Sequence, residues 1–252
     1  MSFIYSQRLV MSKILYSLCL FVYSYAISIN GFTQTISVVT EDAPSLQYQK
    51  TSGEMAGPAA KLIEKVFNES GLSFETRVLP WARAYKEANL VPNTLIYSMV
   101  RTIEREDKFH WIGIISKPKY YFFALKNTEI PSSNNIKDFS KYRVGSLLSS
   151  ASYSTLKAQG FEYLVPVTTA KQVFQLLTKN RVDLITANLT AFDEICQHHS
   201  TECSQIKAIA PIEPLNNRAL YFAMNKDSDP KVVQRLRRSY QKLLKENKIK
   251  IL

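Results

Sequence analysis

The chain has little glycine and none of the glycine-rich nucleotide motifs. Its 7 glycines in 252 residues are under half of the usual share of about 7%. Neither G-x-G-x-x-G nor G-x-x-x-x-G-K-[ST] occurs, so the loops that hold phosphates in nucleotide-binding proteins are not indicated. G-x-S-x-G and H-E-x-x-H are missing as well, and no Ser-His-Asp order stands out. We therefore predict no catalytic residue.

Long apolar runs occur only at the start of the chain. Residues 1–26 contain two basic residues, no acidic residue, and an apolar stretch that ends in small side chains at Ala26. This order is typical of a secretory signal peptide, and we expect cleavage after Ala26, or after Gly31 as the second choice. The alternative is an uncleaved anchor, which needs about 20 apolar residues, but Asn30 interrupts the run. The mature protein is therefore expected to be soluble and periplasmic.

Cysteine is also scarce, with 3 residues in the chain. One of them lies in the expected leader, which leaves Cys196 and Cys203. An oxidising compartment favours a disulfide across this short loop. The alternative is a metal site that includes His198, but the paired spacing of structural zinc sites is missing. We expect the disulfide, no metal and no cofactor.

The net charge of +11 is unevenly distributed. Residues 230–252 hold eight basic residues and one acidic residue, whereas residues 27–229 have a net charge of only +2. In a groove that binds nucleic acid, the basic residues would be spread over the groove and not clustered at one end of the chain. We therefore expect no nucleic-acid partner. We interpret the cluster as the solvated face of a terminal helix, with docking to an anionic membrane or partner as the alternative.

The rest of the chain alternates apolar segments with amphipathic ones. Residues 58–70 place apolar side chains at helical spacing between Pro58 and Gly71, which are suited to the start and end of a helix. The same kinds of signal predict strands at 36–40, 74–79, 95–99, 143–146, 163–165 and 182–187, and helices at 81–90, 152–159, 170–179, 190–199 and from 230 onward. This alternation predicts an α/β fold with largely parallel sheets.

A break in the pattern predicts two lobes. Apolar runs at 120–125 and 219–224 are suited to two extended segments that cross between them. We expect residues 27–120 plus 221–252 to form lobe one and residues 121–220 to form lobe two.

Several segments, in this order, resemble a known family. The segments are Thr40-Glu41-Asp42-Ala43-Pro44, Gly57 with the helix from Pro58, Pro80-Trp81-Ala82-Arg83-Ala84-Tyr85, Leu95 to Arg105, Tyr142-Arg143-Val144-Gly145 and Asn180-Arg181-Val182-Asp183. Together they resemble the bacterial extracellular solute-binding protein family 3, the periplasmic amino-acid-binding type. The resemblance runs from about Thr35 to Asn247.

The resemblance implies both a fold and a function. The fold is periplasmic-binding-protein-like type II, with two α/β lobes joined by two crossing strands and a ligand cleft between them. The function is not enzymatic: the protein is expected to act as a monomer and close on a small polar, carboxylate-bearing ligand, such as an amino acid or related metabolite. An inner-membrane ABC permease or a sensor would be the partner. The alternative is a dehydratase-like periplasmic enzyme on the same scaffold.

The resemblance also implies ligand-binding residues. Arg105 matches the arginine that holds the ligand's carboxylate, and a guanidinium fork suits that group. The plainer alternative is a surface ion pair with a neighbouring acidic residue. Ser98 matches a pocket position in lobe one, and Ser149 and Ser150 match a ligand-binding turn in lobe two.

One position departs from the family pattern. Asn188 stands where amino-acid binders carry an Asp for the ligand's ammonium, and a neutral amide cannot supply that charge. Glu41, Asp42 or Asp193 could supply a carboxylate from elsewhere. Trp81 and Arg83 would stack a flat ligand or cation. The alternative is that Trp81 is a core residue and Arg83 is solvated beside it.

Overall fold

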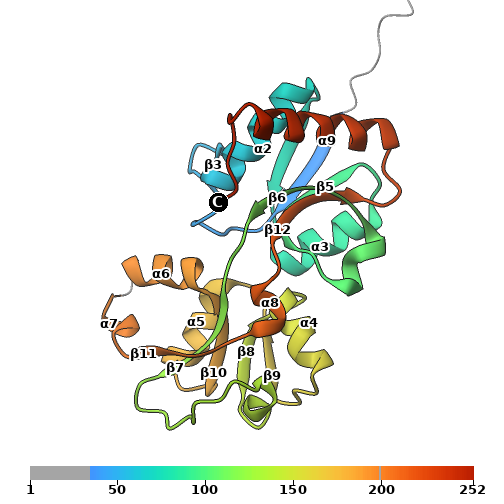
Figure 1. Cartoon of the computed structure of the whole chain (residues 1–252). Helices are drawn as coiled ribbons and strands as arrows, with labels where there is room; N and C mark the ends of the chain where they lie inside the picture. The colour runs from blue at the N-terminus through green and yellow to red at the C-terminus, as the bar shows by residue number, and fades with distance from the viewer. Residues whose placement is uncertain (1–34, 199) are drawn as a thin grey trace, which may run out of the picture. The chain divides into compact units, whose positions relative to one another are not determined.

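The computed structural model describes residues 35–198 and 200–252 (Figure 1). The expected signal peptide, residues 1–26, lies outside these residues, as does its predicted cleavage site. None of the helices in the described part of the chain has both the length and the apolar character that crossing a bilayer requires.

The first sheet has five strands in the order β4-β1-β5-β12-β6. Its strands are β1 (Ile36–Thr40), β4 (Phe74–Val78), β5 (Thr94–Val100), β6 (Phe109–Ser116) and β12 (Leu220–Asn225). β1 runs parallel to β4 and β5, whereas β12 is antiparallel to β5 and β6. The helices α2 (Pro58–Ser70), α3 (Trp81–Leu90) and α9 (Pro230–Lys245) pack against it, and a small β2–β3 hairpin (Tyr48–Gln49 and Met55–Ala56) precedes α2.

The second sheet also has five strands, in the order β11-β7-β10-β8-β9. Its strands are β7 (Tyr120–Leu125), β8 (Val144–Leu147), β9 (Leu164–Val167), β10 (Leu184–Asn188) and β11 (Ile206–Pro211). Its helices are η2 (Ile136–Phe139), α4 (Ala151–Ala158), α5 (Ala170–Thr178), α6 (Leu189–His198), α7 (Ser200–Cys203) and α8 (Glu213–Asn216). The mixed α/β fold class is therefore confirmed.

The expectation of largely parallel sheets is wrong. Each sheet has four strand pairings. Two of them join three neighbouring parallel strands, and the other two are antiparallel. Parallel neighbours need a crossover connection, usually a helix. β7 and β12 instead enter their sheets from the other sheet, after β6 and after β11. The boundaries of the two lobes at residues 120 and 220 stay a prediction.

The turn before α2 requires a glycine. Gly57 has φ 97°, and a Cβ atom there would lie 2.5 Å from the carbonyl oxygen of Leu46. The Leu46 oxygen in turn accepts a 2.8 Å hydrogen bond from the amide of Ala59, in the first turn of α2. Because Gly57 has no Cβ atom, Leu46 can approach the start of the helix closely enough to form this bond.

Two leucines belong to the packing of more than one core. Leu46 packs against the cluster around Leu62 and Tyr97 and also against a cluster in the second sheet around Phe122. Leu147, at the end of β8, packs against the cluster around Trp81 and against a further second-sheet cluster. The cores of the two sheets are therefore in contact.

The structure contains the Cys196–Cys203 disulfide, with an S–S distance of 2.11 Å. It joins α6 to α7, in agreement with the sequence expectation. Within residues 35–198 and 200–252, no group of three His, Cys, Asp or Glu side chains is arranged to hold a metal ion.

Candidate functional site

The candidate site centres on a buried arginine. Arg105 lies in the short 3₁₀ helix η1 (Ile103–Lys108), directly after β5, and its side chain is only 2% exposed. Nη1 donates a 3.0 Å hydrogen bond to the carbonyl oxygen of Val100, and Nη2 donates a 2.9 Å bond to that of Ser149. A solvated surface ion pair does not describe this residue.

Two aromatic rings of α3 lie against the guanidinium of Arg105. Its Cζ atom is 5.6 Å from the ring centroid of Trp81 and 4.8 Å from that of Tyr85. The two rings stack on each other because they are four residues apart on one helix face. Burial lowers the pKa of Arg105, whereas Tyr85 and Glu104 raise it and offset part of this effect. An arginine nevertheless remains charged, and the ring faces help to stabilise that charge.

The carbonyl oxygen of Ser149 joins the two sheets. It accepts a 2.9 Å hydrogen bond from the indole Nε1 of Trp81 in addition to the bond from Arg105. Ser149 follows β8 and has φ 60°, a left-handed conformation that is uncommon for a residue with a side chain. This turn directs a second-sheet carbonyl at two donors of the first sheet.

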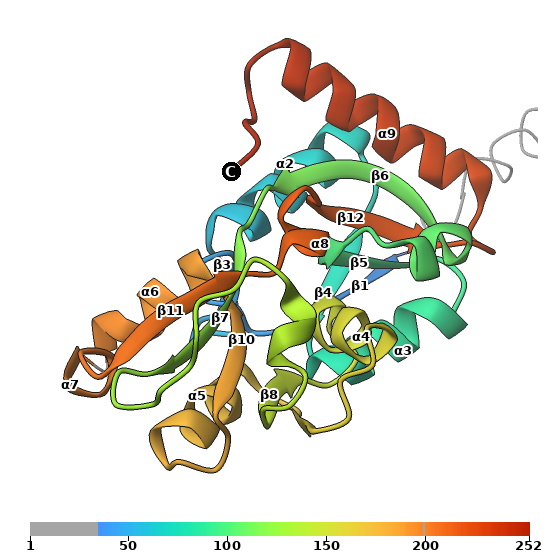
Figure 2. The same ribbon diagram turned by 60° about the horizontal axis from the view of Figure 1, so that its bottom comes forward.

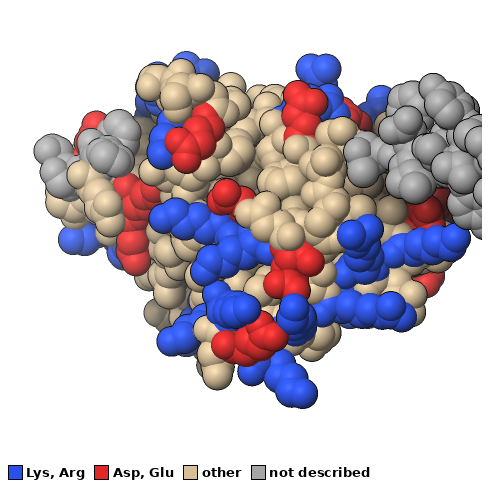
Figure 3. All heavy atoms as spheres, turned by 90° about the horizontal axis from the view of Figure 1, so that it is seen from above, with Lys and Arg blue, Asp and Glu red and all other residues tan. Residues whose placement is uncertain are grey.

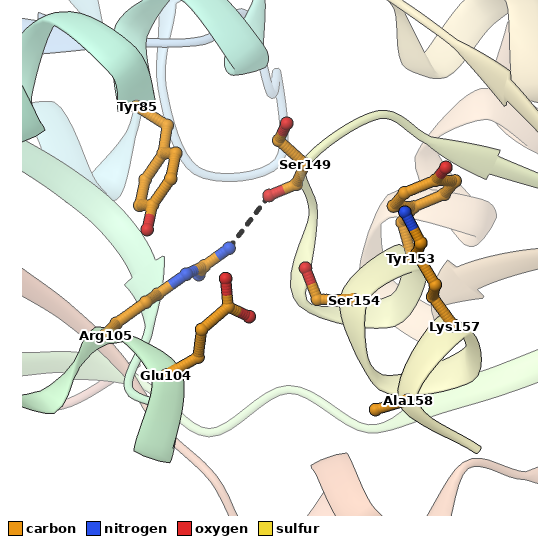
Figure 4. A pocket seen from close by; sticks show the side chains of 8 residues that line it. All are labelled: Tyr85, Glu104, Arg105, Ser149, Tyr153, Ser154, Lys157 and Ala158. Atoms are coloured by element: carbon orange, nitrogen blue, oxygen red, sulfur yellow. Dashed lines mark hydrogen bonds between the residues drawn. The ribbon is translucent and has the colours of Figure 1, made fainter. Parts of the chain in front are cut away.

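A cavity of about 370 Å³ opens beside Arg105. Figure 4 shows Tyr85, Glu104 and Arg105 on one side of it and residues of the Ser149 turn and α4 on the other. The lining residues are Tyr85, Glu104, Arg105, Ser149, Tyr153, Ser154, Lys157 and Ala158. The cavity combines two cations, one carboxylate, hydroxyl groups and aromatic surface, which suits a small polar molecule.

Ser98 belongs to a hydrogen-bonded group with Gln47 and Glu41. It has φ 61° where the register of β5 and β12 shifts, and its hydroxyl lies 2.7 Å from Oε1 of the fully buried Gln47. Nε2 of Gln47 donates a 3.2 Å bond to the carbonyl oxygen of Glu41. A carbonyl only accepts, so the amide of Gln47 has one orientation and Ser98 must donate to it. The Ser98 oxygen is left with acceptor capacity only.

Glu41 is a carboxyl group with a strongly altered pKa. Burial raises its pKa to about 8, and the charge of Asp42 adds to the effect. The pKa of Tyr120, at the start of β7, is raised mainly by burial and also by Glu41, whereas Arg105 lowers it. Glu41, Tyr120 and Arg105 therefore form one electrostatic group.

Two predicted ligand residues cap helices. Oδ1 of Asn188 accepts a 2.8 Å hydrogen bond from the amide of Ala191 in the first turn of α6. Oγ of Ser150 accepts a 3.1 Å bond from the amide of Tyr153 in α4. These side-chain oxygens serve the capping role that Asn and Ser commonly have. Asn188 still lies beside Tyr120, its register partner in β7.

The structure brings together only part of the predicted set. Arg105 and Ser149 line the cavity, Trp81 contacts both, and Arg83 is exposed on α3 and does not line it. Sequence reasoning missed Gln47 and Tyr85, and also the α4 residues Tyr153, Ser154 and Lys157. Tyr85 could have been found from its spacing of four residues from Trp81.

These features define a class of protein: an α/β fold in which two five-stranded sheets meet at a polar site around a buried arginine. No family model and no curated protein matches the sequence. Solved structures do match. One is a histidine kinase sensor domain with similarity to periplasmic binding proteins, with a TM-score of 0.73, 16% identity, and coverage of 85% of this chain and 92% of that one.

Two further solved structures are amino-acid-binding proteins. An ancestral arginine-binding protein bound to arginine has a TM-score of 0.72 and 15% identity over 84% of this chain and 93% of that one. The arginine-, lysine-, histidine-binding protein ArtJ from the thermophilic bacterium Geobacillus stearothermophilus has a TM-score of 0.68 and 15% identity, with 85% and 91% covered. The chain therefore has the periplasmic-binding-protein fold, and the resemblance noted from the sequence is confirmed at the level of fold.

Proposed function

We propose that the protein is a periplasmic solute-binding protein that closes on a small polar ligand with an acidic group. The observation that supports this best is the buried, charged Arg105 between the first sheet and the Ser149 turn of the second sheet. A carboxylate matches the guanidinium fork better than a single carbonyl oxygen does. The ligand would replace the Ser149 oxygen as the acceptor at Nη2, or it would accept from the guanidinium N–H groups of Arg105 that are not used in these two bonds.

The second recognition element is the pair of Ser98 and Glu41. Ser98 offers the ligand an acceptor, and Glu41 is a carboxyl that a cationic group would favour in its ionised form. Asn188 and Ser150 cap helices, so they are less suited to be primary contacts. We therefore expect a ligand with an anionic group at Arg105 and a hydrogen-bond donor, such as an amine, at Ser98. The fold neighbours that bind arginine and glutamine are consistent with an amino acid or a related metabolite.

Closure would couple binding to a partner. A ligand shifts a two-state equilibrium only when it contacts one state better than the other. A ligand held by Arg105 in lobe one and by the Ser149 turn and α4 in lobe two meets that condition. An inner-membrane ABC permease or a sensor would then recognise the closed monomer. The ligand would be released unchanged, because the role is binding and not catalysis.

The test is a thermal-shift screen followed by calorimetry. Amino acids, amines, dicarboxylates and small peptides are the panel, since a ligand that binds only the folded state raises the melting temperature. Arg105→Lys keeps the charge but loses the fork, so it should weaken binding about 10- to 100-fold. Arg83→Lys, on the exposed side of α3, is the matched control and should bind normally.

Three results would count against the proposal. The first is a panel in which no compound raises the melting temperature. The second is equal affinity of the wild type and a folded Arg105→Lys variant. The third is chemical conversion of the bound compound, detected by mass spectrometry after incubation, which would indicate an enzyme instead.

A further inference from the structure

The helix α9 has two faces of opposite character. Val233, Leu236, Tyr240 and Leu243 are buried in the core of the first sheet. Figure 2 shows the helix lying over β6, with α2 nearby. The exposed face holds Lys231, Arg235, Arg238 and Lys242. Their spacing of four, three and four residues places these side chains on one stripe, which spans about 16 Å of helix.

The stripe borders a groove between α9 and the end of α2. The groove has a volume of about 580 Å³ and is lined by the four cations together with Glu69, Ser70, Gln234 and Ser239. Seen from above, Lys and Arg side chains gather in this region of the surface (Figure 3). The groove is therefore lined by four cations and one carboxylate.

Little of this charge is neutralised by the protein. Lys242 forms an ion pair with Glu69, and Asp229 caps the helix by accepting from the Lys231 amide. The guanidinium of Arg235 lies over Gly71, where it would be 3.0 Å from an added Cβ atom. In the described residues, no carboxylate is paired with Lys231, Arg235 or Arg238.

The face also lacks the apolar centre of a protein interface. Large exposed apolar side chains in residues 35–198 and 200–252 are Tyr48, Leu90, Val91, Ile103, Tyr163, Ile251 and Leu252, and none is on α9. Stable protein contacts usually bury aromatic or apolar residues at their centre. A cationic stripe without apolar residues instead suits a surface that presents many anionic groups, such as phosphate headgroups.

We propose that the stripe Lys231-Arg235-Arg238-Lys242 docks on an anionic phospholipid surface. Each basic side chain near such a surface contributes enough to change the binding constant about fivefold. The contact is electrostatic, because the apolar face of α9 is buried in the protein. It therefore weakens as salt is added. The protein, held on the membrane surface, would then reach a membrane partner by diffusion in two dimensions.

The test measures co-sedimentation of the full chain with vesicles of neutral phosphatidylcholine, with and without phosphatidylglycerol. We expect binding only to the anionic vesicles and its loss as sodium chloride rises from about 50 to 300 mM. Arg235→Gln/Arg238→Gln should weaken binding about 25-fold. Lys171→Gln/Lys179→Gln, with exposed lysines at the two ends of α5, removes the same charge and should bind like the wild type. All variants share residues 1–34 and are first shown to fold by circular dichroism.

The other outcomes each overturn the proposal. Equal binding to neutral vesicles, or no binding to either kind, removes the anionic membrane as the partner. Equal loss of vesicle binding in the two double variants would show that binding depends on the net charge of the protein and not on the stripe. Competition by millimolar inorganic phosphate at constant ionic strength would make the groove a site for a soluble phosphate compound. Failure of ligand binding in the screen above has no bearing on this result, because the stripe and the Arg105 cavity share no residue.

Discussion

The hydroxyl of Ser98 donates a 2.7 Å hydrogen bond to the side-chain carbonyl of Gln47, which lies 51 residues earlier in the chain. Because the other end of the Gln47 amide is held by the Glu41 carbonyl, one buried side chain sets the position of two candidate ligand residues. The bond also uses the hydroxyl proton of Ser98, so its oxygen can only accept a hydrogen bond from any further partner.

Replacement of Gln47 should destabilise the folded protein and leave Ser98 and Glu41 less well positioned. Gln47→Leu leaves the Ser98 hydroxyl and the Glu41 carbonyl without their partner, so the free energy of unfolding should fall by about 1–3 kcal/mol. Gln49→Leu is the control, because its bond to the Gly53 carbonyl is exposed. That variant should stay within about 0.5 kcal/mol of the wild type. Urea unfolding measures both, and equal losses would contradict the structural role of Gln47.

Glu41 should make the protein less stable as pH rises. Its pKa of about 8 in the folded state is above the ordinary value of 4.5, so between these values the folded state binds more protons than the unfolded state. The free energy of unfolding therefore falls from about pH 4.5 to pH 8 and levels off above that, by at most about 1.4 kcal/mol per pH unit. Urea unfolding of the wild type and Glu41→Gln at pH 5, 6, 7 and 8 checks this. The variant should lack this part of the slope, and parallel curves would show that Glu41 is not the source.

The indole of Trp81 should hold the Ser149 turn. Trp81→Phe keeps an aromatic ring near Arg105 but removes the donor to the Ser149 oxygen, a loss of about 0.5–1.5 kcal/mol. Amides at the turn, such as that of Ser150, should exchange faster with solvent as a result. Trp111→Phe removes an indole donor from the Glu106 carbonyl instead and should leave the turn unchanged. Identical exchange at Ser150 in both variants would mean that the turn is held by other contacts.

The disulfide should stabilise the protein independently of the site. Closure of the short loop between Cys196 and Cys203 contributes about 2–3 kcal/mol in the chain-entropy account. Reductant should therefore lower the free energy of unfolding of the wild type but not of Cys196→Ser/Cys203→Ser. An effect of reductant on both proteins would point to a different cause. Ligand affinity should be the same with and without the bond, since neither cysteine lines the cavity.

Local elements were predictable because their signals are local. The predicted bounds 36–40 and 81–90 match β1 and α3, and Gly71 ends α2 in the left-handed conformation. Apolar periodicity, proline and glycine act within a few residues, so the sequence displays them directly. The apolar runs at 120–125 and 219–224 did indicate extended segments where the chain crosses between lobes, but they did not show that β7 and β12 pair antiparallel with their neighbours.

The site was predictable where a family pattern could be matched and not elsewhere. Arg105 and Ser149 do meet in the structure, yet matching alone could not show that Asn188 and Ser150 cap helices. Gln47 looks like one polar residue in a loop, and its importance comes from a partner 51 residues away. Long-range pairing of that kind depends on tertiary structure, which a single sequence does not display.

The position of Leu147 affects how the protein unfolds. Its side chain packs against apolar clusters of both sheets, as does that of Leu46. Separation of the two sheets exposes these leucines to water, and melting of either sheet removes packing from the other. Heat should therefore unfold residues 35–252 in a single cooperative transition, with equal calorimetric and van't Hoff enthalpies.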